Sequence, residues 1–169
     1  VKRKHAPKHR NIRVFVELSV WYAITAENNM IRALFIGSII DRLEQNGYRA
    51  DIYAVSSSDA SRDHLPQSQL SVKIKDSGQR LNLLDVMFAL GHPSMLRRFK
   101  FALEGCVPEI GLKYENRGLV SECFDDDYKP GPNSYYFKSI PVTDQKRYAL
   151  DPLEIVRDII PDDLPIKIV

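Results

Sequence analysis

The most constraining feature of the sequence is a strand–helix–strand pattern in its first third. Residues 12–18 (IRVFVEL) are short, apolar and rich in β-branched side chains, which is typical of a buried strand. Residues 29–46 carry a wide apolar stripe and are followed by Gly47, a residue suited to a left-handed helix end. Residues 50–56 (ADIYAVS) are expected to form a second strand. A helix wide enough to cover a sheet, placed between two strands, indicates a parallel crossover and an α/β fold.

The rest of the chain continues with shorter elements. We expect strands at residues 70–75, 109–115 and 135–143, helical pieces at 82–90 and 94–104, and a last helix at 151–160. The two helical pieces are separated at Pro93, where we expect His92 to take a structural role by hydrogen-bonding a freed backbone carbonyl. Gly37 is expected to let its helix approach a sheet closely. We therefore predict a three-layer fold with a mostly parallel central sheet flanked by helices.

Length and composition agree with one globular domain. The chain has 169 residues, of which 44% are apolar and 27% are charged. We expect a basic N-terminal arm at residues 1–11 and a single domain at 12–169. The two cysteines, Cys106 and Cys123, are 17 positions apart and have no CxxC spacing, so they indicate neither a disulfide scaffold nor a four-ligand zinc site. Without a long apolar run or a secretory signal, we expect a cytoplasmic protein and no membrane partner.

The charge distribution raises a second possibility for the partner. Residues 1–13 contain six basic residues and no acid, whereas the other 18 Lys and Arg are outnumbered by 22 Asp and Glu. The basic residues are Lys2, Arg3, Lys4, Lys8, Arg10 and Arg13. Such an arm can neutralise nucleic-acid phosphates, dock on an acidic protein, or remain a solvated linker. Arg97 and Arg98 could extend a basic face. The arm has no aromatic residue for stacking on bases, which disfavours single-strand recognition.

Oxygen-bearing side chains follow three of the expected strands. The first strand ends in Glu17-Leu18-Ser19, the strand at 70–75 is followed by Asp76-Ser77-Gly78, and the strand at 135–143 by Asp144. Ligands of open parallel sheets bind beyond the carboxyl ends of the strands. Hard oxygen ligands suit Mg²⁺, Ca²⁺ or Mn²⁺. The sequence therefore predicts that the oxygen-bearing turns at residues 17–19, 76–78 and 143–144 meet at one rim of the sheet.

The element order and the turn after the first strand resemble a von Willebrand factor type A-like domain. The whole chain is similar to uncharacterised phage and bacterial proteins of this Rossmann-like kind, most clearly in the run FALGHPSMLRR at residues 88–98. Family members with an intact metal site carry Asp-x-Ser-x-Ser after the first strand, with a Thr and an Asp from later loops.

Only part of that metal motif is present in this chain. Ser19 matches, but Glu17 replaces the leading Asp and Trp21 replaces the second Ser. Ser77 stands in the place of the Thr, and Asp144 lies where the last acid is expected. The resemblance therefore implies a degenerate metal-ion-dependent adhesion-type site, with no cofactor or with Mg²⁺ or Mn²⁺.

The resemblance implies a non-enzymatic module that binds another protein. In a phage or mobile element it would act as an assembly or adaptor component in a bacterial cytoplasm. The alternative is a nucleic-acid-associated protein that uses the basic arm. A third class, a metal-dependent hydrolase, would require Glu17 and Asp144 to share a cation. The sequence contains no Gly-x-Ser-x-Gly elbow, no His-Glu-x-x-His helix and no phosphate-binding glycine motif, so we favour the non-enzymatic classes.

Overall fold

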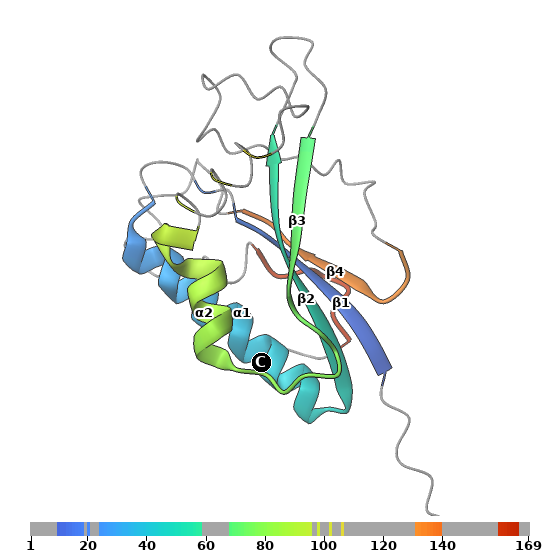
Figure 1. Cartoon of the computed structure of the whole chain (residues 1–169). Coiled ribbons are helices and arrows are strands. Elements are labelled where there is room, and N and C mark those ends of the chain that lie inside the picture. Colours follow the sequence, from blue (N-terminus) through green and yellow to red (C-terminus); the bar gives the residue numbers. More distant parts are fainter. Residues whose placement is uncertain are drawn as a thin grey trace, which may run out of the picture.

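A computed structural model of the chain shows an α/β fold. It describes residues 10–18, 20, 24–58, 68–95, 98, 102, 106, 131–139 and 159–165. Within this part, a four-stranded mixed sheet has two helices packed on one face (Figure 1). The elements are β1 (Arg10–Glu17), α1 (Ala26–Gln45), β2 (Tyr48–Ser58), β3 (Ser68–Lys75), α2 (Leu83–Gly91) and β4 (Ser134–Phe137). The predicted α/β class is thereby confirmed.

The strand order in the sheet is β3-β2-β1-β4. The strand β1 runs parallel to β2 along its whole length and parallel to β4 on its other side, which confirms the expected crossover through α1. The strand β3 is antiparallel to β2, so the sheet is mixed. The reason is the connection between them, since residues 59–67 are fewer than the dozen or so that a parallel crossover needs.

The first helix begins earlier than its apolar stripe suggests. Thr25 is the N-cap, and its Oγ1 accepts a hydrogen bond of 3.1 Å from the backbone N–H of Asn28. The helix therefore starts at Ala26. At the other end, Gly47 has a φ of 85°, as predicted for a residue in the left-handed region after a helix.

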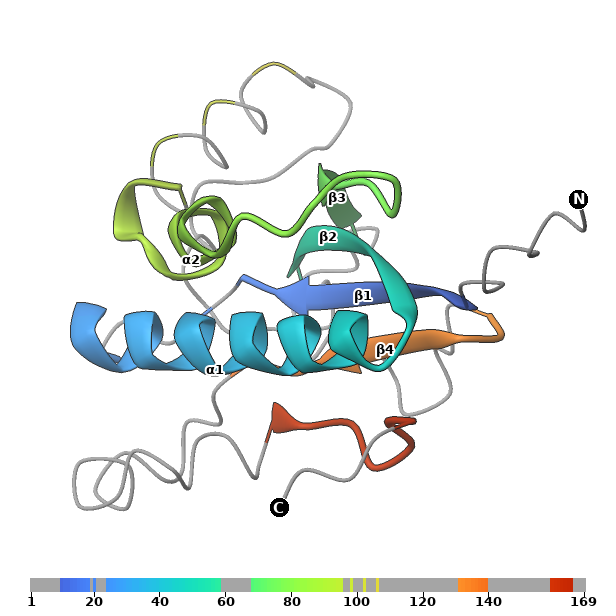
Figure 2. The same ribbon diagram turned by 90° about the horizontal axis from the view of Figure 1, so that it is seen from below.

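The core lies between the sheet and the two helices. Alternate residues of β1 and β2 point to this side, while α1 and α2 lie next to each other across it (Figure 2). The buried side chains include Ile12, Val14 and Val16 of β1, Ile52 of β2, Ile36, Ile40 and Leu43 of α1, and Val86 and Leu90 of α2. Each such side chain contributes about 1.5–3 kcal/mol of burial free energy.

Two glycines allow α1 and α2 to pack closely. A Cβ on Gly37 of α1 would collide with Leu83 of α2, and one on Gly91 of α2 would lie 2.7 Å from the Cβ of Ala33. The expectation that Gly37 faces the sheet is therefore wrong, because the close neighbour is the second helix.

Several predicted elements fall largely or wholly outside the described residues. The segments 94–104, 109–115 and 151–160 are affected, and β4 occupies only the start of the strand expected at 135–143. Both helices of the described part lie on the same face of the sheet. In that part of the chain, neither helix has the length and apolar character that crossing a membrane requires.

Candidate functional site

The carboxyl ends of β1 and β4 meet where the strand order reverses. From β1 the chain passes outward to β2 and then β3, and it later returns to place β4 on the opposite side of β1. In open α/β sheets, the crevice beyond such a reversal is the usual place for a ligand. We call these carboxyl ends of β1 and β4 the edge of the sheet, and a ligand of such a fold is expected there.

The side chain of Arg32 lies at this edge and forms hydrogen bonds to the ends of both strands. Its Nη2 donates hydrogen bonds to the backbone carbonyl oxygens of Glu17, at 2.6 Å, and Lys138, at 2.9 Å. Glu17 is the last residue of β1, and Lys138 directly follows β4. The side chain of Arg32 is completely buried. One guanidinium from α1 thus joins the ends of two strands that are far apart in the sequence.

Burial disfavours the charged form of this arginine. It lowers the pKa of Arg32 from 12.5 to about 10, although the nearby Glu17 and Tyr136 partly oppose the shift. No residue in the described part of the chain accepts a hydrogen bond from Nε or Nη1 of Arg32. Even with the lowered pKa of about 10, the Arg32 guanidinium is protonated at neutral pH, so it places a buried positive charge at this edge of the sheet.

Glu17 is also fully buried at this edge. Its Oε2 accepts a hydrogen bond of 3.1 Å from the phenol of Tyr136, which lies on β4. The phenol of Tyr136 thus already donates to an oxygen of this carboxylate, whereas the Arg32 guanidinium contacts the backbone carbonyl of Glu17.

The predicted metal ligands do not all converge. Ser77 follows β3, and its backbone N–H donates to Oδ1 of Asp51, near the beginning of β2. Because β3 is antiparallel to β2, Ser77 lies at the edge of the sheet opposite Glu17, and it is not part of the predicted rim. Ser19 and Asp144 lie outside the described residues. Among the described residues, no cluster of three His, Cys, Asp or Glu side chains could hold a metal.

The described members of the predicted basic face are Arg10, Arg13 and Arg98. Arg10 donates to the hydroxyl of Tyr48 at 3.4 Å, and its guanidinium lies over that ring. Arg13 is exposed on β1, and Arg98 is exposed beyond α2. Lys2, Arg3, Lys4, Lys8 and Arg97 lie outside the described residues.

The face of the sheet turned away from the helices carries a row of rings. Phe15 of β1 pairs with Tyr53 of β2 and Tyr136 of β4, and Tyr53 pairs with Lys73 of β3. The rings of Phe15 and Tyr53 stack at a centroid distance of 4.9 Å, while the Lys73 ammonium lies 5.4 Å from the Tyr53 centroid. Because Lys73 and Phe15 flank Tyr53, its ring has little free face on which a nucleic-acid base could stack.

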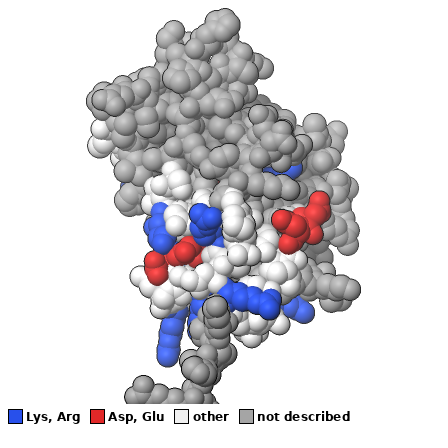
Figure 3. Space-filling view, turned by 90° about the vertical axis from the view of Figure 1, so that its right-hand side faces the viewer, with Lys and Arg blue, Asp and Glu red and all other residues white. Residues whose placement is uncertain are grey.

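Charges on that face are mixed rather than of one sign. Basic and acidic side chains lie among uncharged surface there (Figure 3). Lys73 forms ion pairs of 3.0 Å with both Asp51 and Asp76, and these contacts raise the pKa of Lys73. This pairing leaves little positive potential for attracting a phosphate backbone.

A third feature, which the sequence interpretation missed, is an apolar surface on the two helices. Leu84 is 75% exposed and Phe88 is 43% exposed on α2, while Leu34 of α1 is 41% exposed. The sequence signal was the composition of α2 (LLDVMFALG), in which apolar residues occur on every side of the helix. A helix of that kind is buried on all sides or has a partner. We call Leu34, Leu84 and Phe88 the helical apolar surface.

His92 takes the structural role that the sequence suggested. It ends α2, its Nδ1 accepts a hydrogen bond of 3.2 Å from the backbone N–H of Ser94, and its ring stacks on Phe88. The partner is a backbone N–H rather than a freed carbonyl. The imidazole therefore caps the turn that follows α2 and borders the helical apolar surface.

Comparison with known proteins gives one match. Residues 1–159 match the model of a family described as a domain of unknown function, DUF7192. No curated protein and no solved structure matches the chain.

Proposed function

The chain belongs to the DUF7192 family, whose description assigns no activity, and we propose from its geometry that it is a non-enzymatic module that binds another protein through the helical apolar surface. The observation that carries this proposal is the exposure of Leu84 and Phe88. These residues are four positions apart, so they lie on the same side of α2.

The surroundings of this surface indicate what kind of partner fits. Leu34 is exposed on α1 next to Ala33, which contacts Gly91 of α2, and we propose that it extends the apolar surface onto α1. Paired helices that expose apolar side chains are suited to receive an amphipathic segment of a partner.

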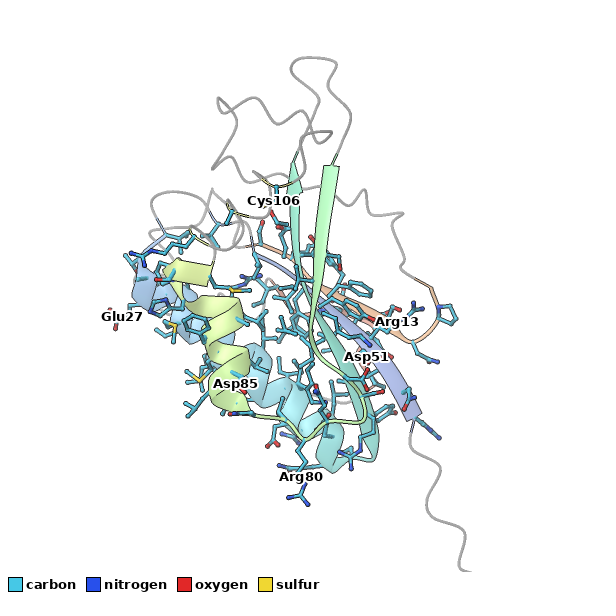
Figure 4. The ribbon with its side chains drawn as sticks, viewed as in Figure 1. Arg13, Glu27, Asp51, Arg80, Asp85 and Cys106 are labelled. Atoms are coloured by element: carbon cyan, nitrogen blue, oxygen red, sulfur yellow. The ribbon has the colours of Figure 1, made fainter. Side chains whose placement is uncertain are left out.

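The exposed charges on the two helices are predominantly acidic. Glu27, Asp41 and Asp85 are exposed, with Arg42 as the exposed basic residue on α1. Figure 4 shows Glu27 and Asp85 on the helical side, away from Arg13 and Asp51 on the sheet. We therefore propose a partner segment whose apolar side chains are flanked by Lys or Arg. The same charges disfavour nucleic acid on this surface.

We also propose the finer fold and context that the sequence resemblance implies. A parallel β1–α1–β2 crossover with β4 on the other side of β1 is compatible with a three-layer von Willebrand factor type A-like arrangement. In that case the edge at Glu17 corresponds to a degenerate adhesion-type site in which Arg32 supplies the positive charge. A phage assembly or adaptor role in a bacterial cytoplasm fits such a module.

Site-specific photo-crosslinking tests the docking surface. A photoreactive phenylalanine analogue would replace Leu84 in the full chain, expressed in cells of its natural host. The matched control places the same analogue at Ser71, an exposed residue of β3. We expect a discrete adduct with one other protein from position 84, and none from position 71.

A second substitution makes the result specific. Phe88→Asp in the Leu84-substituted chain should reduce the adduct at least tenfold, because it places a charge in the apolar contact. The proposal is wrong if position 84 gives no adduct, if both positions give the same adducts, or if the adduct is nucleic acid. An adduct with a second copy of this chain would show that the helical apolar surface mediates self-association and does not bind a different protein.

A further inference from the structure

Arg32 has more hydrogen-bonding capacity than its two backbone contacts use. A guanidinium has five N–H donors, and three of them belong to Nε and Nη1. Among the described residues, none of these three has an acceptor, and Arg32 forms no ion pair. A buried cation left in this condition is costly, and proteins retain few such groups without an ion or water to satisfy them.

Asn29 is a second unsatisfied group on the same side of α1. It precedes Arg32 by three residues, a spacing that brings side chains of a helix together. Its Nδ2 donates a hydrogen bond of 2.7 Å to the carbonyl oxygen of Gly91, which fixes the amide. Its Oδ1 is buried and has no donor among the described residues. Donors without acceptors and an acceptor without a donor thus lie on one helical face.

We propose that this edge of the sheet binds a small, singly charged oxyanion that also carries a hydroxyl, namely a hydroxy-carboxylate. The carboxylate oxygens accept from Nε and Nη1 of Arg32, and the hydroxyl donates to Oδ1 of Asn29. Charged donors and acceptors form the stronger hydrogen bonds of proteins, and arginine is well suited to carboxylates.

The buried Glu17 carboxylate favours a ligand with a single negative charge. Its carboxylate is close enough to stabilise the positive charge of Arg32. Glu17 would therefore repel a doubly charged phosphate more strongly than it would repel a monocarboxylate. This site is independent of the helical apolar surface, so it adds to the proposed function and does not rest on it.

The site lies close to the exposed start of α1. Side chains of a helix lean toward its N-terminus, so the Arg32 guanidinium is displaced toward Thr25. Thr25, Ala26 and Glu27 are exposed at that end. With a rise of 1.5 Å per residue, the Cα of Arg32 is about 10 Å from that of Thr25 along the helix. The helix dipole at this end also favours an anion.

Nuclear magnetic resonance of the arginine Nε–H groups tests this directly. The full chain, labelled with ¹⁵N, would be titrated with glycolate at constant ionic strength, with parallel titrations of acetate, inorganic phosphate and sodium chloride. We expect glycolate to shift one Nε–H signal saturably, and Arg32→Met to remove that signal. Acetate, which lacks the hydroxyl, should bind about tenfold more weakly, as expected for one hydrogen bond.

Two further variants separate binding from folding. Arg42→Met, which alters an exposed arginine of the same helix, should leave the glycolate response unchanged. Asn29→Ala should reduce the preference for glycolate over acetate to less than twofold while the Arg32 signal still shifts. If Arg32→Met does not fold, the wild-type titrations still show whether glycolate binds saturably and more tightly than acetate, phosphate and chloride. The proposal is overturned if no oxyanion gives a saturable shift, if chloride gives the same shift, or if phosphate binds more tightly than glycolate.

Discussion

The Nη2 of Arg32 lies 2.6 Å from the carbonyl oxygen of Glu17, which ties the second turn of α1 to the last residue of β1. The same nitrogen reaches the chain just after β4 at Lys138. A single side chain therefore connects α1, β1 and the end of β4 where the strand order reverses. Its removal should lower the free energy of unfolding of the whole fold.

We expect Arg32→Ala to lower the free energy of unfolding by about 2–5 kcal/mol. The substitution leaves two carbonyl groups without their donor and creates a cavity beside the buried core. Urea unfolding followed by circular dichroism would measure it. Arg42→Ala, at an exposed arginine of the same helix, should change stability by no more than about 0.5 kcal/mol. Equal effects of the two substitutions would contradict the role given to Arg32.

The ion pair between Lys75 and Glu44 should respond unequally to the loss of either partner. The Lys75 Nζ lies 2.7 Å from Glu44 Oε1 and is buried, whereas Glu44 also faces Arg49 at 3.7 Å. Glu44→Gln leaves a buried ammonium without a carboxylate and should cost about 3–5 kcal/mol. Lys75→Met leaves Glu44 with Arg49 and should cost less than half as much. Urea unfolding of both variants checks the order, and the reverse order would count against this account.

The two glycines between the helices should differ in their tolerance of a methyl group. In Gly37→Ala the new Cβ meets the end of the flexible Leu83 side chain, and the gain in helix propensity of about 1 kcal/mol offsets the rearrangement. In Gly91→Ala the new Cβ meets the Cβ of Ala33, which cannot rotate away, so we expect a loss of about 1–3 kcal/mol. Thermal unfolding of both variants would measure the difference, and equal midpoints would contradict it.

Asp76 should titrate below the ordinary range of an aspartate. The backbone N–H of Gly78 and the ammonium of Lys73 hold the pKa of Asp76 below 3.8. Since the pKa is lower in the folded state, this contribution to stability is complete above pH 3.8 and is lost as the pH falls through the folded pKa. Carboxyl carbon chemical shifts followed against pH measure the midpoint. Lys73→Met should raise it, and an unchanged midpoint would remove Lys73 as a cause.

Divalent cations should not bind at the edge formed by Glu17. The adjacent guanidinium of Arg32 opposes a second positive charge, and the phenol of Tyr136 already donates to the Glu17 carboxylate. Calorimetry with Mg²⁺ and with Mn²⁺ should therefore give no saturable heat for the wild type or for Glu17→Gln. Saturable heat in the wild type that disappears in Glu17→Gln would establish a metal site that includes this carboxylate.

The sequence was sufficient for the local pattern but not for the direction of every strand. Apolar periodicity placed β1, α1 and β2 within a few residues of their observed bounds, because each has a buried side along most of its described length. Alternation in residues 70–75 identified β3, but a strand has the same pattern in either direction. The length of the connection at 59–67 contained that information, and its neglect moved Ser77 to the wrong edge.

The sequence also contained a signal for Arg32, the central residue of the candidate site. Arg32 lies three residues after Asn29 and four residues before Ile36, and both of these residues are buried. A charged residue within an apolar stripe indicates a buried charge that needs partners. Those partners, Glu17 and Lys138, could not be inferred from spacing, because the contact of Lys138 depends on where β4 joins the sheet.

The position of β4 in the sheet has a consequence for how the chain folds during its synthesis. Translation supplies β1, α1 and β2 early, but the second neighbour of β1 begins only at Ser134. Until the ribosome has released that segment, one side of a strand destined for the centre of the sheet has unpaired backbone groups that can recruit foreign strands. Nascent chains that stop short of Ser134 should accordingly depend on chaperones, whereas those extended past Lys138 should not.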